Sequence, residues 1–559
     1  MKRSIRILLI GWFAAVLLGG AWFVNSVHAD EQDYYYRLKK SWQYMQRVYE
    51  QLNMHYVEEI DPYPLIKAGI DGMLDKLDPY TVFIEEDGDR RLQIITTGKY
   101  GGLGMEISMR DKKVTVISPM EKSPAKRAGI QAGDIIEKID DLELKGLSID
   151  EVSRKLRGEV GTEIKLSLKR PGFDTPIELT LKREEIVIED VGYAGFVEPG
   201  VAYVSLNGFT EKAAVELKNT ILNLQSEGQI RSFILDLRGN PGGLLESAVD
   251  VVNLFVDKDE LVVSTKGFRE GEVKFYTDKK PLLPHVPLAV LVDEGSASAS
   301  EIVAGALQDL DRAVIVGQPT FGKGLVQKVY TIDKESDAKL KITTAKYYIP
   351  SGRCIQKKDY SEDNDVIFSH KKMTGDEQPS HIFYTRNKRE VLDQGGIYPD
   401  MEVVGDSINY VFIELIRQNM FFDYAVQYHL DHPTWQGEFK IDDKTCQQFH
   451  DFLKAKNFQY DMEGTQELQK LEKIASKKEF SDDILGLIGQ LRVKLENEKE
   501  RDFQDNRPVI KRYLKMELAE KYFGKKTRDQ YSIEFDPQVK EARLLMKDQQ
   551  RYVKILANK

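Results

Sequence analysis

Cysteine is almost absent from this sequence, which holds only Cys354 and Cys446 among its 559 residues. Two thiols are too few for a disulfide framework or a cysteine-rich zinc site, and the pair forms one bridge or none. Histidine is also scarce, with 8 residues, and no His-Glu-x-x-His pair is present. A zinc protease of that type therefore has no support, and neither a metal nor another cofactor is expected.

Positive charge is not in excess either. The 80 Lys and Arg residues stand against 90 Asp and Glu residues, so the formal net charge is −10. Broad binding to nucleic acid usually needs a basic surface, and the composition argues against that class of protein. The hydrophobic share of 41% is ordinary for a globular chain. A chain of this length is expected to form about three or four domains.

Charge is missing from residues 7–24, a mostly apolar run that follows a basic N-terminus. Val27-His28-Ala29 then places small residues at the two positions that a signal peptidase recognises. The run of 18 residues is also just long enough to span a bilayer. Residues 1–29 are therefore predicted to be a cleaved signal peptide or a retained inner-membrane anchor. Both alternatives place the rest of the chain outside the cytoplasm, in the periplasm if the cell has two membranes.

Hydrophobic periodicity divides the rest of the chain into four parts. A helical segment comes first, and short β-rich runs broken by glycine follow it. Strands then alternate with helices, as in an α/β domain. The last part is helix-rich and strongly charged, which predicts a solvated domain for oligomerisation or partner docking. The predicted ranges are 30–98 for the helical segment, 99–185 for the β-rich domain, 186–404 for the α/β core with a polar insertion at 357–392, and 405–559 for the charged helical domain.

The α/β core holds a serine-rich turn, residues 295–301, between a predicted buried strand and a helix that runs to about Leu310. Small residues allow a tight turn and let a substrate approach a serine hydroxyl. The free N–H groups at the start of the helix favour a developing negative charge. A plain helix cap is the alternative interpretation of such a serine run.

Glycines flank Lys323 in an apolar stretch, residues 320–327. Burial would lower the pKa of its amine and allow it to act as a general base, whereas an exposed turn lysine is the alternative. Residues 317–323 also fit the first seven positions of a phosphate-binding P-loop. Gly324 stands where that loop needs Ser or Thr, and a strand pattern follows, so the P-loop is rejected. His285 is the only histidine of the core and is interpreted as a packing residue, not as part of a Ser-His-Asp site.

Seven motifs between residues 38 and 405 resemble, in the same order, those of the C-terminal processing peptidases. These peptidases, also called tail-specific proteases, are PDZ-containing serine peptidases with a Ser–Lys dyad. The motifs are Leu77-Asp78-Pro79, Tyr100-Gly101-Gly102-Leu103-Gly104, Asp236-Leu237-Arg238-Gly239-Asn240-Pro241-Gly242-Gly243, Gly295 to Glu301, Phe321 to Gln327, Ser351-Gly352-Arg353 and Gly396-Ile397-Tyr398-Pro399-Asp400.

The resemblance implies a multidomain α+β protein in which a PDZ domain is inserted in an α/β, crotonase-like (ClpP-like) peptidase core. It also implies an exported serine endopeptidase that recognises protein C-terminal tails and cleaves peptide bonds through an acyl-enzyme. By position in the motifs, Ser298 is the nucleophile, Lys323 the general base, and Gln327 the residue that holds the amine. The implied oxyanion hole consists of two backbone N–H groups. One belongs to Ala299 and the other to a glycine of the Gly242-Gly243 pair, of which Gly242 is favoured.

The β-rich domain at 99–185 resembles the PDZ domain of the family. The segment Gly101-Gly102-Leu103-Gly104 would receive the terminal carboxylate, and Leu103, Met105 and Ile107 would line the pocket for the last side chain. The expected partners are flexible or unfolded C termini of exported proteins. A regulatory partner, a homo-oligomer and membrane attachment through the N-terminus stay open.

Two rival functions remain to be weighed. An inactive PDZ scaffold would have a damaged dyad, but Ser298, Lys323 and Gln327 are all present. An acyl-CoA enzyme of the related crotonase-like fold would need a cytoplasmic cofactor, which the predicted export opposes. Asp309 lies 11 residues after Ser298, about three helical turns away, and is interpreted as a structural residue and not as a charge relay.

Overall fold

The computed structural model describes residues 33–357, 360, 382–393, 395–405, 410–462, 464–478 and 480–557. The predicted export segment, 1–29, and most of the predicted polar insertion lie outside these residues. The chain forms two compact units, of which the first ends at Phe83 and the second begins at Ile84. Within the described ranges, no helix is both long and apolar enough to cross a membrane.

The first unit is helical, as the sequence predicts. A helix spans residues 33–55, and α2 follows at Pro62–Leu74. The Asp61 carboxylate accepts a hydrogen bond of 3.1 Å from the backbone N–H of Tyr63, and proline occupies the first position of α2. An N-cap acceptor and an N-terminal proline together define where this helix begins.

The β-rich domain begins the second unit, after helix α3 (Glu86–Thr97). Its main sheet has the order β3-β4-β5-β7-β8, with β6 beside β5, while β2 pairs with β9. Strand β3 therefore forms one edge of its sheet. A capping box of Ser148 and Glu151 opens α5. The elements are β2 (Lys99–Gly102), β3 (Met105–Arg110), β4 (Lys113–Pro119), α4 (Pro124–Arg127), β5 (Ile135–Ile139), β6 (Leu142–Glu143), α5 (Ile149–Leu156), β7 (Glu163–Lys169), β8 (Ile177–Lys182) and β9 (Glu184–Val187).

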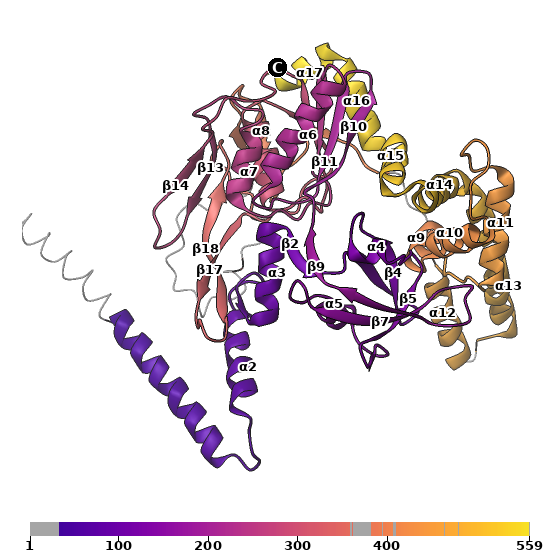
Figure 1. The fold of residues 1–559 in the computed structure, drawn as a ribbon, viewed down its shortest axis with the longest axis horizontal. Helices are drawn as coiled ribbons and strands as arrows, with labels where there is room; N and C mark the ends of the chain where they lie inside the picture. Colours follow the sequence, from indigo (N-terminus) through magenta and orange to yellow (C-terminus); the bar gives the residue numbers. More distant parts are fainter. Residues whose placement is uncertain are drawn as a thin grey trace, which may run out of the picture. The chain divides into compact units, whose positions relative to one another are not determined.

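A six-stranded sheet forms the α/β core (Figure 1). Its order is β10-β11-β12-β15-β16-β21, and every pair is parallel except β10 with β11. The strands are β10 (Val191–Glu198), β11 (Val201–Leu206), β12 (Ser232–Asp236), β15 (Leu288–Val292), β16 (Val314–Gly317) and β21 (Met401–Glu402). Strands β12 and β15 are buried throughout. Their near-continuous apolar sequence is typical of parallel strands covered on both faces.

Helices cover both faces of this sheet. On one face lie α6 (Ala213–Glu227), α7 (Leu245–Val252) and α8 (Ala299–Asp309), whose apolar residues share one core with the strands. The opposite face packs against α15 (Lys525–Phe535), α16 (Pro537–Lys547) and α17 (Gln549–Leu556). The C-terminal helices, which the sequence pattern assigned to the charged domain, thus supply one layer of the α/β core.

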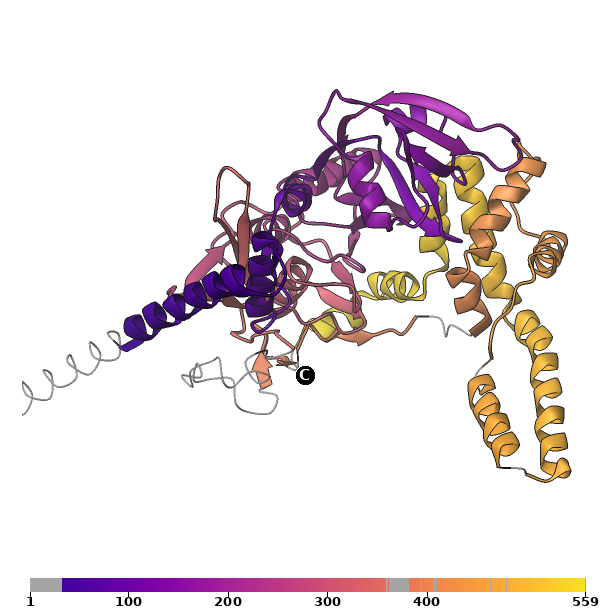
Figure 2. The ribbon, with the colours of Figure 1, turned by 90° about the horizontal axis from the view of Figure 1, so that it is seen from below.

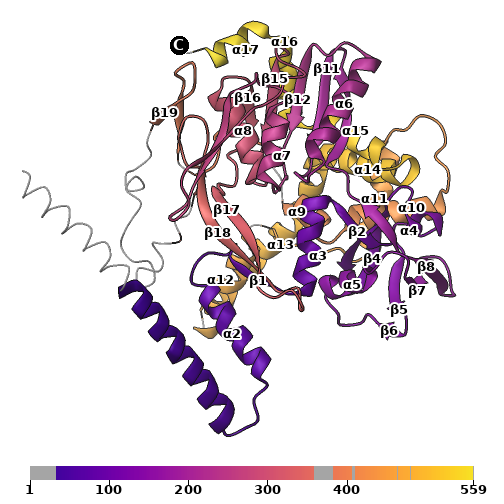
Figure 3. The ribbon, with the colours of Figure 1, turned by 60° about the vertical axis from the view of Figure 1, so that its left-hand side comes forward.

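A second sheet lies beside the core and contains a long hairpin (Figure 3). Its strands include β13 (Leu261–Lys266), β14 (Val273–Tyr276), β17 (Leu325–Thr331) and β18 (Lys339–Tyr348). The predicted polar insertion ends in a small antiparallel pair, β19 (Ile382–Tyr384) and β20 (Glu390–Leu392). That end of the insertion is therefore regular, whereas the sequence suggested an irregular segment.

The remaining helices form a separate aromatic-rich core. It contains α9 (Tyr410–Arg417), α10 (Met420–Asp431), α11 (Asp443–Ala455) and α14 (Arg507–Phe523). The antiparallel pair α12 (Thr465–Lys477) and α13 (Asp482–Asp505) has a small core of its own (Figure 2). Cys446 is buried in α11 and Cys354 lies in the α/β part, and no disulfide joins them.

Candidate active site

Ser298 occupies a strained position at the start of α8. It is the N-cap residue of that helix, with φ = 56° and ψ = −111°. A non-glycine residue rarely adopts a positive φ, and such strain persists only where the surrounding structure holds it. Strand β15 ends at Val292, so the turn lies at the carboxyl end of a central parallel strand. That edge is where open α/β sheets commonly bind ligands.

The neighbouring serines are committed to holding this turn. Ser296 and Ser300 are completely buried, whereas Ser298 is partly exposed. The Ser296 hydroxyl donates to the carbonyl of Leu237 at 2.8 Å, and the Ser300 hydroxyl donates to the carbonyl of Asn240 at 2.9 Å. Of the three serines, Ser298 alone has an accessible side chain for a reaction with a substrate.

The glycine-rich loop after β12 lies directly against Ser298. A Cβ atom added to Gly242 would come within 2.9 Å of both the Ser298 Cβ and the Ala299 nitrogen. Gly242 has φ = 96°, so both its conformation and this close approach require glycine. Its N–H donates to Asn240 Oδ1 at 2.9 Å, and the carbonyl of Asn240 accepts from the N–H of Ala297 at 3.0 Å. The fold thus brings Gly242, Ala299 and Ser298 together.

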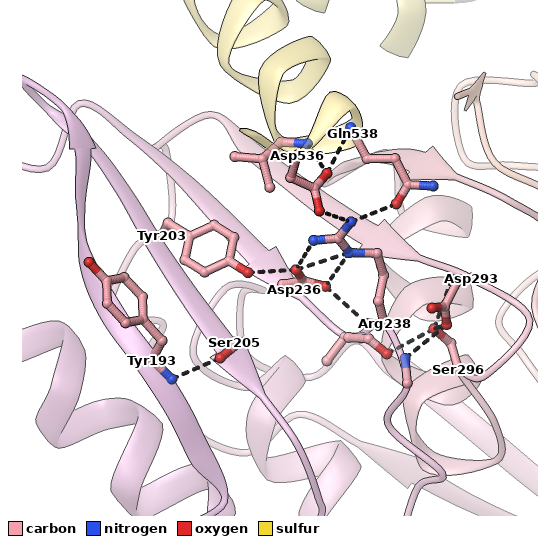
Figure 4. Close-up of polar contacts among 12 residues, drawn as sticks. Tyr193, Tyr203, Ser205, Asp236, Arg238, Asp293, Ser296, Asp536 and Gln538 are labelled. Carbon is pink, nitrogen blue, oxygen red and sulfur yellow. Dashed lines mark hydrogen bonds and ion pairs between the residues drawn. The ribbon is translucent and has the colours of Figure 1, made fainter. Parts of the chain in front are cut away.

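Arg238 anchors the start of the same loop (Figure 4). Its Nε lies 2.9 and 3.0 Å from the two carboxylate oxygens of Asp236, which also accepts a hydrogen bond of 2.6 Å from the Tyr203 hydroxyl. Its Nη1 contacts Asp536 at 2.6 Å and Gln538 at 2.9 Å. The last two residues belong to the start of α16, so the C-terminal helices help to hold the loop.

The Glu301 carboxylate connects the backbone around Ser298 with the backbone around Lys323. Its Oε2 accepts the N–H of Ser298 at 2.8 Å and the N–H of Lys323 at 2.9 Å. Its Oε1 accepts the hydroxyl of Thr320 at 2.6 Å and the N–H of Gly322 at 2.7 Å. One completely buried carboxylate therefore binds four donors from the two loops. Buried polar groups need such partners, since an unpaired one destabilises the fold.

Burial raises the pKa of Glu301 to about 7, although its four hydrogen bonds oppose that shift. The carboxylate therefore changes its charge near neutral pH. Only the ionised form can accept from all four donors, because a protonated carboxyl must itself donate from one oxygen.

Tyr347 forms a second connection between the same two loops. Its hydroxyl lies 2.7 Å from the carbonyl oxygen of Lys323 and 3.1 Å from the carbonyl oxygen of Ser298. Tyr347 is 1% exposed, and burial followed by the nearby charge of Glu301 raises its pKa, so the hydroxyl keeps its proton and donates it. It reaches the site from β18, a strand that no motif used in the sequence analysis includes.

Two further predicted residues take up defined positions. Gln327 lies on β17, and its Nε2 donates to the hydroxyl of Thr343 at 3.3 Å. Asp309 lies at the C-terminal end of α8, where it forms a buried ion pair of 2.9 Å with Arg353 and accepts the N–H of Ser351. Burial raises the pKa of Asp309, and the charge of Arg353 opposes the shift. These contacts agree with the interpretation of Asp309 as a structural residue.

The β-rich domain has a narrow groove between β3 and α5. Five of the six residues predicted to bind a tail line it, together with residues of α5 that the sequence analysis did not single out. The lining residues are Tyr100, Gly102, Leu103, Gly104, Met105, Ile107, Ser153, Leu156 and Arg157. Gly101 instead packs its backbone against Gly158, whose N–H donates to the Gly101 carbonyl at 3.1 Å.

Sequence reasoning missed Glu301, Tyr347 and Arg238 as parts of the site. Glu301 and Arg238 belong to motifs of the family, which could have marked them as candidates, but their partners come from other parts of the chain. Tyr347 gave no signal beyond a strand pattern. Among the residues that the structure describes, no cluster of His, Cys, Asp or Glu side chains is arranged to hold a metal ion.

Four family models match the chain. Residues 200–366 match peptidase family S41, and residues 115–170 match a PDZ domain. Residues 411–546 match the model "Probable PDZ-protease, C-terminal helical domain", and residues 21–88 match the "Activating protease CtpB N-terminal domain". The second unit is thus a multidomain assembly of PDZ, peptidase and helical parts.

Curated relatives agree with these models. The carboxy-terminal-processing protease of Bartonella bacilliformis is 40% identical over 313 residues, which cover 55% of this chain and 71% of the relative. A "Probable CtpA-like serine protease" of Staphylococcus haemolyticus is 34% identical over 65% of this chain and 71% of its own length.

Among solved structures, the photosystem II D1 C-terminal processing protease is 27% identical. The match covers 65% of this chain and 87% of that chain, with a TM-score of 0.36, which is too low to add to the assignment. The family models and the curated relatives assign the chain to its family without this structure. The chain therefore belongs to the carboxy-terminal processing proteases, serine-type peptidases of family S41 that carry a PDZ domain.

Proposed function

We propose that this protease acts outside the cytoplasm, takes up the flexible C termini of exported proteins in its PDZ groove, and cuts upstream of them with Ser298 and Lys323. The observation that carries the dyad is the shared acceptor: the backbone N–H groups of both residues donate to one oxygen of Glu301. The buried hydroxyl of Tyr347 lies within hydrogen-bond distance of both carbonyls on the other side. These contacts fix the backbones of Ser298 and Lys323 relative to each other.

In the first step, Lys323 acts as a neutral amine and takes the proton of the Ser298 hydroxyl. The oxygen attacks the peptide carbonyl, whose C–O π electrons move to the oxygen to form a tetrahedral oxyanion. The N–H of Ala299 stabilises that charge at the start of α8, where free N–H groups favour anions. Gly242 is the second proposed donor, and its N–H must exchange Asn240 Oδ1 for the oxyanion.

The oxyanion then collapses and the C–N bond breaks. Lys323 returns the proton to the leaving amine, and the N-terminal part of the substrate stays bound to Ser298 as an ester. Water attacks this ester while Lys323 takes one of its protons, and Ser298 is regenerated with a proton from the lysine. Gln327 is proposed to orient the amine of Lys323 from β17. Atoms and charge balance without a cofactor.

Tail capture is supported by the position of β3 at the edge of its sheet. A peptide can add to such an edge as a further strand, and Gly102, Leu103 and Gly104 line the end of the groove where its carboxylate would bind. The side-chain pocket is proposed to use Met105 and Ile107. Residues 1–29 support export through their composition alone. Whether that segment is cleaved or retained stays open.

The peptidase core is proposed to be crotonase-like. A parallel sheet with helices on both faces, and a reactive serine at the start of the helix after a central strand, support this assignment. The ranges predicted from the sequence for each domain are kept as part of the proposal, except that α15, α16 and α17 at the end of the 405–559 range are counted with the core.

The test is cleavage of a protein with a flexible apolar C-terminal tail, followed by mass spectrometry of the products. Ser298→Ala and Lys323→Ala are expected to lower kcat by at least about a thousand-fold. Lys328→Ala is the matched control, because Lys328 is an exposed lysine on β17, the strand that begins two residues after Lys323, and it pairs with Glu270. Tail binding, measured separately by fluorescence anisotropy, should persist in all three variants. A Ser298→Ala protein that cuts at the native rate would show that another group is the nucleophile.

A further inference from the structure

A basic cavity adjoins the proposed tail groove of the PDZ domain. It has a volume of about 300 Å³ and lies between α3 and α5. Arg157 and Ser153 line both this cavity and the groove, so the two hollows meet at the C-terminal half of α5. A bound tail would therefore pass beside the cavity.

The cavity carries an excess of positive charge. Among the described residues that line it, Arg91, Arg154 and Arg157 are basic and Asp150 is acidic. Asp150 pairs with Arg91 at 3.0 Å, and both side chains are more than half exposed. Three cations against one anion contrast with the formal net charge of −10 for the whole chain. The field of these side chains therefore attracts an acidic group.

Apolar atoms line the cavity beside the arginines. Ile94 and Ile95 of α3 contribute them, and Ile95 is 57% exposed. An apolar wall with guanidinium groups next to it suits a side chain that has a carbon stem and a terminal carboxylate. Arginine presents planar, paired N–H donors that match a carboxylate, and it keeps its charge at every accessible pH. Glutamate fits this combination better than aspartate, because its stem is longer.

Arg157 connects the cavity with the carboxylate end of the groove. It is the C-cap residue of α5, and its guanidinium lies 5.1 Å from the ring centre of Tyr100, which also lines the groove. Gly102 and Gly104 line the same groove, so a terminal carboxylate and the side chains just before it lie near Arg157. The basic cavity is therefore within reach of residues upstream of the terminal one.

We propose that this cavity selects tails that carry an acidic side chain, with glutamate preferred, among the few residues just before the C-terminal residue. This inference rests on the proposed capture of tails by the PDZ domain. It adds a charge requirement to the apolar pocket for the last side chain and makes Arg154 and Arg157 specificity-determining residues.

The experiment uses the full chain with Ser298→Ala, which prevents cleavage. Fluorescein-labelled decapeptides with an apolar C-terminal residue carry either Glu or Gln at the second, third or fourth position from the end, and Kd is measured by anisotropy. At one of these positions, Glu is expected to bind about two- to five-fold more tightly than Gln, the upper part of the range of an exposed charge pair. About 0.5 M salt should remove most of that difference.

The variant Arg154→Gln/Arg157→Gln is expected to bring the Kd values of the Glu and Gln peptides to nearly the same value. The ratio of the two Kd values is the readout, because Arg157 also lines the groove and its loss can weaken both peptides. Lys155→Gln is the matched control, since Lys155 is an exposed cation on the same helix that does not line the cavity. It should keep the full difference.

Three outcomes would overturn the inference. If Glu and Gln peptides bind equally at all three positions, the cavity does not select acidic tails, while the capture of tails stands. If Lys155→Gln removes as much discrimination as the double variant, the effect is the general field of the domain and not the cavity. If no peptide binds the native groove, the tail-capture proposal fails, and this inference fails with it.

Discussion

Replacing Glu301 with glutamine tests whether the buried carboxylate positions the dyad. The substitution keeps the size of the side chain but turns one acceptor oxygen into an NH₂ group. If the NH₂ takes the place of Oε2, the N–H groups of Ser298 and Lys323 both lose their acceptor. If it takes the place of Oε1, the N–H of Gly322 loses its acceptor. In both arrangements at least one buried N–H group of the site is left unpaired.

The effect on stability has two opposing parts. Each buried N–H without an acceptor costs about 1–3 kcal/mol. Conversely, burial raises the pKa of Glu301 from 4.5 to about 7, so above pH 7 the ionised carboxylate costs about 3 kcal/mol that a neutral amide does not. These contributions largely cancel at pH 8. The free energy of unfolding of Glu301→Gln should therefore lie within about 2 kcal/mol of the native value.

No opposing effect offsets the expected loss of activity in Glu301→Gln. The lost hydrogen bonds are those that fix Ser298 and Lys323 relative to each other, and a shift of about 1 Å in reacting groups can cost about a hundred-fold in rate. We therefore expect kcat of Glu301→Gln to fall by about a hundred-fold with little change in KM.

The assay is steady-state cleavage of a tailed substrate at pH 8, with urea unfolding of the same samples. Glu294→Gln is the matched control, because Glu294 is an exposed carboxylate in the same turn. A kcat for Glu301→Gln within about three-fold of the native value would refute the positioning role. A large loss of stability that accounts for the lost activity would refute it as well.

Four further predictions concern Glu301, Tyr347, Gly242 and Asp536. Because folding raises the pKa of Glu301, protonation of this carboxyl contributes fully to native stability below pH 4.5, and the contribution is lost as the pH rises through 7. Urea titrations should show the native protein losing up to about 3 kcal/mol relative to Glu301→Gln over that interval. Tyr347→Phe leaves the carbonyl of Lys323 without its donor and should lower the free energy of unfolding by about 1–3 kcal/mol and reduce kcat, whereas Tyr276→Phe, at an exposed position, should change neither. Gly242→Ala would bring a Cβ within 2.7 Å of the Ala297 carbonyl and should abolish cleavage, whereas Gly239→Ala, where φ is also positive but no atom lies within 4 Å, should retain most of it; equal kcat/KM values would contradict this. Asp536→Ala removes both the N-cap of α16 and the contact with the Arg238 guanidinium, and it should lower the free energy of unfolding by about 2–4 kcal/mol. Asp548→Ala removes an N-cap acceptor of α17, which accepts the backbone N–H of Arg551, and should cost about 1 kcal/mol; similar losses in urea unfolding would argue against the Arg238 contact.

The sequence pattern predicted the elements around the site closely. Helix α8 ends within one residue of the predicted Leu310. The alternation after Gly324, which rejected a P-loop, is strand β17. These elements were predictable because apolar periodicity and glycine positions act over a few neighbouring residues. The family assignment was also confirmed, because its motifs are local strings of residues.

Other features depend on residues that lie far apart in the chain. Helices α16 and α17 have ordinary amphipathic sequences, and nothing in them indicates that they cover the α/β sheet. The contact between Arg238 and Asp536 spans 298 residues. The roles assigned to Ser298, Lys323, Gln327 and the oxyanion hole stay predictions until the variants are measured.

By itself, the sequence determined which residue types stand in the reactive turns and the order of strands and helices that carry them. Both follow from short-range forces, namely turn geometry, helix capping and the burial of apolar stripes. Only the tertiary structure decided that Glu301 and Tyr347 connect the loops of Ser298 and Lys323, and that arginines from α3 and α5 meet beside the tail groove. These contacts join residues that are distant in the chain. They depend on how whole helices and strands pack, which no local sequence pattern encodes.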